Sequence, residues 1–227
     1  MKTPRNVLVA GASSGIGEAI ARAFAKQGDT VTATGATEAE VHAAMGRLPT
    51  TVRFVQLDVR DGAAVTQLVS ELGDLDVLVN CAGIIRRGQE HEPEVFEEVL
   101  DINLVGTLRL CAAARQGLAN KSGSIVNTAS MLSFFGGGLV PAYSASKGGI
   151  AQLTKSLAIA YAEQGIRVNA IAPGWIATPL TQALQDDPAR SAPIMARTPM
   201  KRWGTPDDLV GPVPVSYTHL TLPTNRE

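Results

Sequence analysis

Short apolar segments alternate with longer segments of helical period along most of this chain. The apolar segments are rich in Val, Ile and Leu, which is typical of strands buried on both faces of a parallel sheet. The pattern predicts strands at Asn6–Ala10, Thr30–Thr34, Val52–Leu57, Val77–Asn80, Ser124–Thr128 and Arg167–Ile171.

The segments between these strands have the 3.6-residue period of helices. Helices are predicted at Gly15–Gln27, Glu38–Arg47, Ala63–Glu71, Pro93–Ala119 and Ala142–Gln164. Because the two kinds of segment alternate as far as about Gly174, we expect an α/β fold with a Rossmann-like, doubly wound parallel sheet and helices on both faces. The 227 residues are enough for a single large domain.

The pattern changes after Gly174. Residues 177–206 carry many prolines and charges, which is typical of a mobile loop or lid over a site. The final stretch, PVSYTHLTLPTNRE, has no clear period. Residues 214–227 therefore neither continue a helix nor supply a strand of the preceding pattern.

Composition narrows the class of partner. Apolar residues make up 45% of the chain, charged residues 18%, and the formal net charge is -1. This balance favours a small-molecule partner over a nucleic acid. Cys81 and Cys111 lie in apolar segments without a disulfide or metal-binding spacing, and the first apolar stretch is too short for a signal peptide or membrane span. A cytoplasmic location and no metal site are expected.

A glycine-rich turn, GASSGIG at residues 11–17, joins the first strand to the first helix. Gly11, Gly15 and Gly17 allow a pyrophosphate to approach N–H groups at a helix N-terminus, where the helix dipole favours anions. The turn therefore indicates a dinucleotide site. The same letters satisfy GxSxG, the nucleophile elbow of serine hydrolases, with Ser13 as nucleophile, but such an elbow requires strands before it, and here the motif follows the first strand.

The segment PAYSASKGG sets Tyr143 and Lys147 four residues apart. At this spacing the two side chains share one face of a helix. An ammonium beside a phenol favours the phenolate and lowers its pKa, which would let Tyr143 exchange a proton with an alcohol or carbonyl oxygen. The alternative is a Tyr and a Lys that only pack along a helix face.

Several motifs occur in one order: GASSGIG, Asn80-Cys81-Ala82-Gly83, Ser130, YSASK and Pro173-Gly174. Together they resemble the short-chain dehydrogenase/reductase family over about residues 5–213. The resemblance places the domain at residues 1–213 and implies that it is incomplete at its C-terminal end, lacks a final strand and is followed at residues 214–227 by a tail foreign to the family. The resemblance implies an NAD- or NADP-dependent oxidoreductase. In it, Tyr143 is the acid/base, Lys147 its electrostatic partner, Ser130 orients the substrate oxygen, and Asn103 holds a proton-relay water.

The resemblance also implies a set of coenzyme contacts. They are Gly11, Ser13, Ser14, Gly15, Ile16, Gly17, Asp58, Val59, Asn80, Ala82, Gly83, Tyr143, Lys147, Pro173, Gly174, Ile176 and Thr178. Some of these have simpler alternatives as turn caps or polar residues bonded within their own segment, Ser130, Asn103 and Asp58 among them. A dinucleotide-binding module without catalysis is the alternative of another class.

The coenzyme preference depends on the end of the second strand, where a carboxylate favours NAD and cations favour NADP. Gly35 stands at that position, in TATGATEAE, and offers neither group. Since the glycine turn also lacks the arginine of many NADP-users, the residues favour NAD.

Further stretches, Ile84-Ile85-Arg86-Arg87, ASMLSFFGG and PMKRWGTPDDLVGPV, resemble the sugar-acid dehydrogenases of this family, the 2-deoxy-gluconate 3-dehydrogenase and gluconate 5-dehydrogenase group. Guanidinium groups suit carboxylates, so Arg86 and Arg87, with Ser130, are candidate substrate contacts. A 3-oxoacyl thioester is the alternative substrate. The resemblance further implies a homo-oligomer, a dimer or tetramer.

Overall fold

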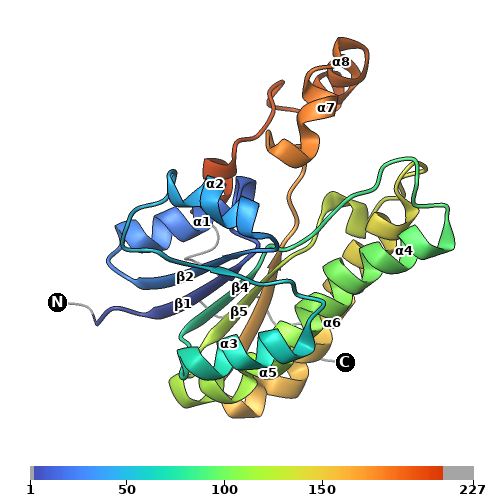
Figure 1. The fold of residues 1–227 in the computed structure, drawn as a ribbon. Helices are drawn as coiled ribbons and strands as arrows, with labels where there is room; N and C mark the ends of the chain where they lie inside the picture. Colours follow the sequence, from blue (N-terminus) through green and yellow to red (C-terminus); the bar gives the residue numbers. More distant parts are fainter. Residues whose placement is uncertain (1–2, 212–227) are drawn as a thin grey trace.

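A single parallel sheet forms the centre of the molecule in the computed structural model, which describes residues 3–211. Its strands lie in the order β3-β2-β1-β4-β5-β6 (Figure 1). They are β1 Asn6–Ala10, β2 Thr30–Gly35, β3 Arg53–Gln56, β4 Val77–Asn80, β5 Ser124–Thr128 and β6 Arg167–Ile171. The predicted α/β fold with a doubly wound parallel sheet is confirmed, and the strand limits differ from the prediction only at β2 and β3.

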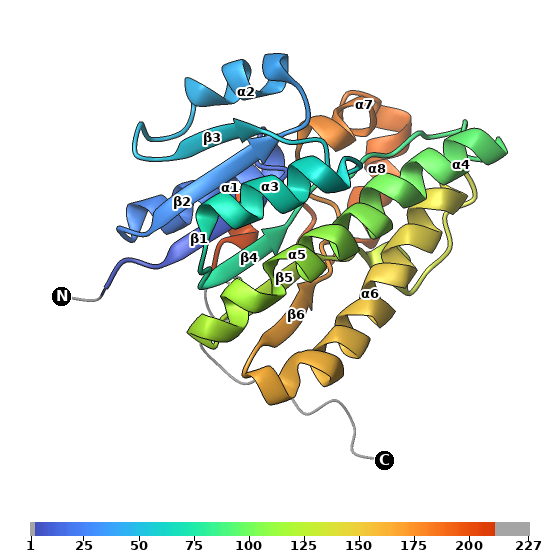
Figure 2. The same cartoon turned by 60° about the horizontal axis from the view of Figure 1, so that its bottom comes forward.

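Helices cover both faces of this sheet. In Figure 2, α3, α5 and α6 lie side by side over one face, and α1 and α2 lie over the other. The bounds are α1 Gly15–Lys26, α2 Glu38–Met45, α3 Gly62–Leu72, α4 Pro93–Leu100, α5 Gly106–Lys121 and α6 Pro141–Tyr161, with a 3₁₀ turn at Ala162–Gln164 after α6. This layering follows from strands that are apolar on both sides.

The two faces hold two separate hydrophobic cores. Along β1, Val7 and Val9 point to one face and pack with Phe24 of α1, whereas Leu8 points to the other and packs with Leu110 of α5. All five side chains are fully buried. Burying an apolar side chain of this size contributes roughly 1.5–3 kcal/mol, so the central strand stabilises both layers at once.

The predicted single helix Pro93–Ala119 is wrong in one respect. The chain forms α4, then a π-helical segment at Asp101–Val105, and then α5 from Gly106. Asn103 lies in the π-helical segment, and its side chain bonds to both backbone polar groups of Ile84, at 2.8 and 3.0 Å. π-helical turns are frequent at functional sites. The apolar period continues through the segment, so periodicity could not reveal it.

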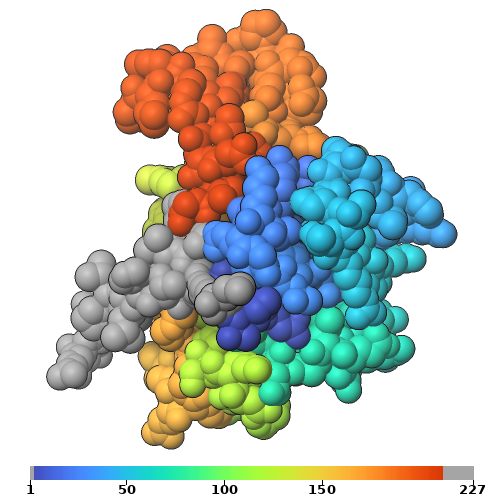
Figure 3. Space-filling model, turned by 90° about the vertical axis from the view of Figure 1, so that its left-hand side faces the viewer, coloured from blue at the N-terminus to red at the C-terminus, as the bar shows by residue number. Residues whose placement is uncertain are grey.

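Residues 177–206, predicted as a loop or lid, contain helices. These are a 3₁₀ turn at Pro179–Thr181, α7 Gln182–Gln185 and α8 Pro188–Arg197, and a further 3₁₀ turn follows at Pro206–Leu209. An earlier 3₁₀ turn lies at Met131–Ser133, after β5. Asp187 caps α8 by accepting from the N–H of Ala189 at 3.0 Å, so Pro188 is a helix-starting proline. Figures 1 and 3 show α7 and α8 projecting from the body of the molecule.

The expected foreign tail, residues 214–227, and the missing final strand lie outside the described residues. Within residues 3–211, no helix has the length and apolar character needed to cross a bilayer.

Candidate active site

A cleft of about 500 Å³ opens at the carboxyl ends of the strands, where β1 and β4 lie side by side. This is the point at which the strand order reverses, the usual ligand site of such sheets. Predicted residues that line it are Gly11, Ser13, Ser14, Gly15, Ile16, Gly17, Asp58, Val59, Ala82, Gly83, Ser130, Tyr143, Lys147, Pro173, Gly174, Ile176 and Thr178.

The glycine turn is shaped for a close-lying ligand. A side chain at Gly11 would bring its Cβ within 2.3 Å of the Ala82 nitrogen, and one at Gly17 within 2.1 Å of the Gly11 oxygen. Gly11 also has a φ of 77°, a conformation that favours glycine. Ser14, the N-cap residue of α1, makes no side-chain cap. The N–H groups at this helix end therefore fit the pyrophosphate of a dinucleotide.

Tyr143 and Lys147 lie together on α6, as the spacing predicted. The Lys147 ammonium is 5.5 Å from the centroid of the Tyr143 ring and donates to the Thr128 carbonyl at 2.6 Å. Ser130 follows β5 and lines the cleft together with Tyr143, where its side chain acts on the pKa of the phenol as a hydrogen-bonding group. Its hydroxyl also accepts from the Leu132 N–H at 3.1 Å, so Ser130 is a turn cap as well.

The expected lowering of the Tyr143 pKa is wrong for this structure. Burial raises the pKa of Tyr143 above its usual value, the hydrogen bond with Ser130 opposes this rise, and the charge of Glu90 adds to it. Burial also lowers the pKa of Lys147 to about 8. Desolvation therefore outweighs the charge effect that the sequence argument used.

Two predicted asparagines lie outside the cleft lining. Asn103 is fully buried and donates to the Ser146 hydroxyl at 3.1 Å, besides its bonds to Ile84, which lines the cleft. Asn80 is 3% exposed and donates to the Asn127 side chain at 2.9 Å in the core. The structure thus does not bring the Asn80 side chain to the coenzyme cleft.

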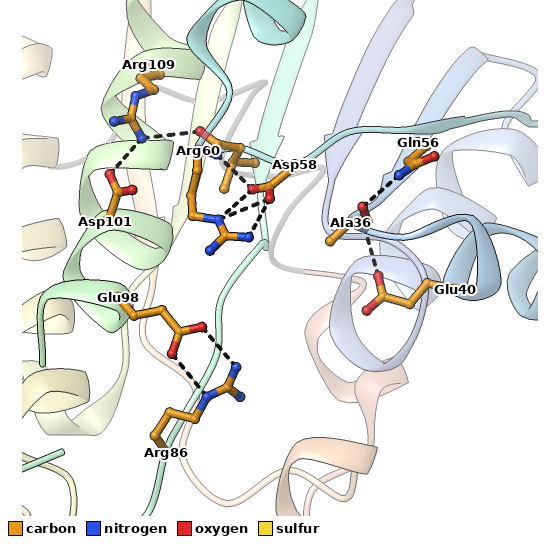
Figure 4. Close-up of polar contacts among 10 residues, drawn as sticks. Ala36, Glu40, Gln56, Asp58, Arg60, Arg86, Glu98, Asp101 and Arg109 are labelled. Atoms are coloured by element: carbon orange, nitrogen blue, oxygen red, sulfur yellow. Dashed lines mark hydrogen bonds and ion pairs between the residues drawn. The ribbon is translucent and has the colours of Figure 1, made fainter. Parts of the chain in front are cut away.

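The two arginines after β4 also lie outside the cleft lining, and they differ from each other. The Arg86 guanidinium pairs with the Glu98 carboxylate at 3.2 Å (Figure 4). Arg87 is partly buried, and its pKa is lowered first by burial and then by the charge of Arg190 on α8, while Glu90 acts in the opposite direction. Arg87 is therefore better placed than Arg86 to meet an anionic ligand.

Glu40 and Arg60 line the cleft and were missed by the sequence argument. Glu40 reaches back from α2 and accepts from the Ala36 N–H at 2.8 Å (Figure 4). It also contacts the Ser13 hydroxyl at 3.4 Å. A Cβ at Gly35 would lie 3.3 Å from the Glu40 carboxylate. Gly35 itself offers no group that could recognise the coenzyme, but it leaves room for the Glu40 carboxylate of α2.

Arg60 lies on the β3 side of the cleft and is paired with Asp58. Its guanidinium donates to both Asp58 oxygens, the shortest contact being 2.6 Å (Figure 4). This pairing lowers the pKa of Asp58. The Arg60 charge is therefore largely balanced where it faces the cleft.

Ser13 is not part of a hydrolytic triad among residues 3–211. Its hydroxyl contacts Glu40, whereas His42 lies 3.7 Å from Glu38 and the His91 ring bonds to the Gly138 carbonyl at 2.9 Å. A nucleophile elbow needs a histidine as base, so the hydrolase alternative has no support.

Residues 11–213 match the family described as enoyl-(acyl carrier protein) reductase, a branch of the short-chain dehydrogenases/reductases. The chain belongs to the short-chain dehydrogenase/reductase family and is an NAD(P)-dependent oxidoreductase acting on CH–OH groups.

Two of the similar relatives within the family are sugar-acid enzymes. The chain is 40% identical over 216 residues to 2-dehydro-3-deoxy-D-gluconate 5-dehydrogenase of Pseudoalteromonas atlantica, covering 90% of this chain and 85% of the relative. It is 33% identical to 5-keto-D-gluconate 5-reductase of Escherichia coli, covering 91% and 85%. The predicted likeness to the sugar-acid group is confirmed.

A solved relative shows the same fold. Gluconate 5-dehydrogenase from Burkholderia cenocepacia, in complex with NADP and tartrate, superposes with a TM-score of 0.85 at 31% identity and covers 93% of this chain and 87% of its own. Because that relative carries NADP, the comparisons give no support to the expected preference for NAD.

Proposed function

We propose that this enzyme interconverts a secondary alcohol and a ketone on a small sugar acid of the hexonate class. The observation that carries the proposal is the grouping of Tyr143, Ser130 and Lys147 in the lining of the same cleft as the glycine turn. A nicotinamide coenzyme bound in this cleft supplies the hydride acceptor or donor.

The side chains divide the remaining work. The Tyr143 hydroxyl gives a proton to the ketone oxygen during reduction and takes it back during oxidation, the general acid–base role. Ser130, which lines the cleft with Tyr143, holds the same oxygen. Lys147 is 4% exposed and fixed to the Thr128 carbonyl, so its charge stays beside the phenol.

The substrate class rests on the relatives and on the loop after β4. The solved relative binds tartrate, a small hydroxylated dicarboxylic acid. In this chain Arg87, partly buried near Arg190, offers a guanidinium suited to a substrate carboxylate. We retain Arg87 as a substrate contact and assign Arg86 to holding Glu98.

The direct test is coenzyme turnover by the full chain with a panel of hexonates and ketohexonates. Turnover of at least one of these acids, with none for the matching neutral polyols, is the expected result. Equal turnover of acids and neutral polyols would contradict recognition of the carboxylate.

A 3-oxoacyl thioester is the second candidate substrate. The segment after Ser130 exposes several large apolar side chains that an acyl chain could cover: Met131, Phe134, Phe135 and Leu139. Turnover of 3-oxoacyl thioesters but of no hexonate would favour this candidate over the first.

We further propose that the coenzyme is NAD. The Glu40 carboxylate lies beyond the end of β2, where it suits ribose hydroxyl groups and opposes a 2′-phosphate. Among residues 3–211, Arg60 is the only cation that lines the cleft on the facing β3 side, and it is held by Asp58. These contacts support NAD even though the solved relative carries NADP.

A homo-oligomer, dimer or tetramer, and a cytoplasmic location also stay proposals. Close helix approach is possible on α6 at Gly148, where a Cβ would meet nothing within 4 Å. Both cysteines are free, which fits a reducing compartment. Light scattering of the purified chain measures the subunit number.

A further inference from the structure

Glu90 is a fully buried acidic residue between two parts of the site. Its exposed fraction is 0%. One carboxylate oxygen accepts from the Arg86 N–H at 2.8 Å, and the other accepts from the Tyr143 N–H at 2.7 Å. Acceptance by both oxygens is the hydrogen-bonding pattern of an ionised carboxylate. A buried carboxylate is tolerated only where such donors meet it.

The contact with Tyr143 caps α6, here called the catalytic helix because it carries Tyr143 and Lys147, with a residue from outside that helix. Tyr143 is the third residue of α6, and N–H groups in the first turn of a helix lack partners within it. The N-cap residue, Val140, provides no side-chain cap. A carboxylate at a helix N-terminus is also favoured by the helix dipole. Glu90 thus supplies the hydrogen-bond acceptor that α6 itself does not offer to the Tyr143 N–H.

The contact with Arg86 belongs to a set of ties between two segments. We define the substrate loop as residues 84–89, between β4 and Glu90. The Gly88 N–H donates to the Leu139 carbonyl at 2.8 Å, and the His91 ring bonds to the Gly138 carbonyl at 2.9 Å. Together with Glu90, these bonds hold the substrate loop against the start of α6.

We propose that Glu90 is a positioning residue that fixes the substrate loop, with Arg87, at a set distance from the Tyr143 hydroxyl. A sugar acid whose carboxylate is held at the loop then presents its reacting oxygen to Tyr143. This inference rests on the proposed function and adds to it the residue that joins recognition to proton transfer.

The charge of Glu90 acts on the same two groups. After burial, which is the largest cause, it adds to the raised pKa of Tyr143. It also opposes the lowering of the Arg87 pKa by burial and by Arg190. The other charged and titratable groups around this junction come from several elements: Lys147 of α6, Cys81 after β4, Arg86 of the substrate loop, His91 before α4 and Arg190 of α8. Loss of the Glu90 charge should therefore lower the pKa of Tyr143.

Two variants separate charge from geometry. Glu90→Gln keeps the size, removes the charge and leaves one oxygen for two N–H donors. Glu90→Asp keeps the charge but is one methylene too short to reach both donors. The control is Glu94→Gln, which removes an exposed carboxylate from the first turn of α4.

For Glu90→Gln we expect kcat/KM for the sugar acid to fall at least about tenfold, through a higher KM, since a hydrogen bond to a buried charge is lost. Coenzyme Kd should stay at the wild-type value, because Glu90 does not line the cleft. Glu90→Asp should raise KM while keeping the wild-type pH profile, and Glu94→Gln should change neither.

The decisive readout does not depend on turnover. Phenolate absorbance, taken as the difference between each protein and its Tyr143→Phe counterpart, titrates Tyr143 directly. Its midpoint should move to lower pH in Glu90→Gln and stay in place in Glu90→Asp. An unchanged midpoint together with an unchanged KM in Glu90→Gln overturns the proposal, as does a failure of both Glu90 variants to fold, which would make the residue purely structural.

This design keeps the two proposals distinguishable. A wild-type protein that turns over no hexonate refutes the proposed substrate class. The Tyr143 titration still tests the link between Glu90 and the catalytic helix in that case.

Discussion

The Lys147 ammonium lies 5.5 Å from the centroid of the Tyr143 ring. Its short hydrogen bond runs to the Thr128 carbonyl at the end of β5, not to the phenol. Lys147 therefore serves Tyr143 as a fixed neighbouring charge. Burial lowers the Lys147 pKa to about 8, and this pKa sets the pH above which the charge is lost.

A pH dependence of ketone reduction follows from this pKa. Below pH of about 8 the Lys147 ammonium is charged, and above it the charge is lost, while the raised pKa of Tyr143 keeps the phenol protonated. Wild-type reduction, measured as kcat/KM against pH, should therefore decline through about pH 8. Lys147→Arg keeps its charge throughout this range, so its profile should lack this decline. A decline at the same pH in both proteins would assign it to another group.

Coenzyme choice should depend on Glu40. Titration of the wild-type protein should give a lower Kd for NAD than for NADP, and Glu40→Gln should reduce that preference at least about tenfold, or about 1.4 kcal/mol. The reason is that the carboxylate at Ala36 opposes a 2′-phosphate.

Glu38→Gln is the matched control for this effect. Glu38 lies on the same helix, but its side chain is 81% exposed and faces His42. The control should keep the wild-type preference. Tighter binding of NADP by the wild-type protein would refute the role of Glu40.

The glycine turn should not tolerate a methyl group at residue 17. In Gly17→Ala the new Cβ would lie 2.1 Å from the Gly11 oxygen, so the turn must shift. We expect coenzyme binding to be largely lost and the free energy of unfolding to fall by about 1–3 kcal/mol, as in other overpacked sites. Gly46→Ala meets nothing within 4 Å and has a φ of -76°, so it should leave both quantities unchanged. Calorimetry and coenzyme titration measure the two effects.

The parts of the site that sequence could predict are those built from neighbours in the chain. The turn at Gly11–Gly17 and the spacing of Tyr143 and Lys147 depend on local geometry, and the structure places these residues around one cleft. The strands could be predicted because residues such as Leu8 and Val9 are buried on opposite faces of the sheet.

The parts that were missed depend on contacts between distant segments. Glu40 reaches the cleft only because α2 folds back over Gly35, and Glu90 meets Tyr143 across 53 residues of chain. The pKa of Tyr143 was predicted in the wrong direction, because the spacing to Lys147 reveals a charge but not the extent of burial. Desolvation is a property of the packed fold.

The central claim is that the Tyr143 hydroxyl transfers the proton, and Tyr143→Phe tests it most directly. This change removes one hydroxyl from a side chain whose backbone contact to Glu90 is retained. Single-turnover hydride transfer at matched coenzyme saturation should fall by about two to four orders of magnitude, with unchanged coenzyme Kd and melting temperature. Near wild-type hydride transfer in a folded, coenzyme-saturated Tyr143→Phe protein would contradict the account.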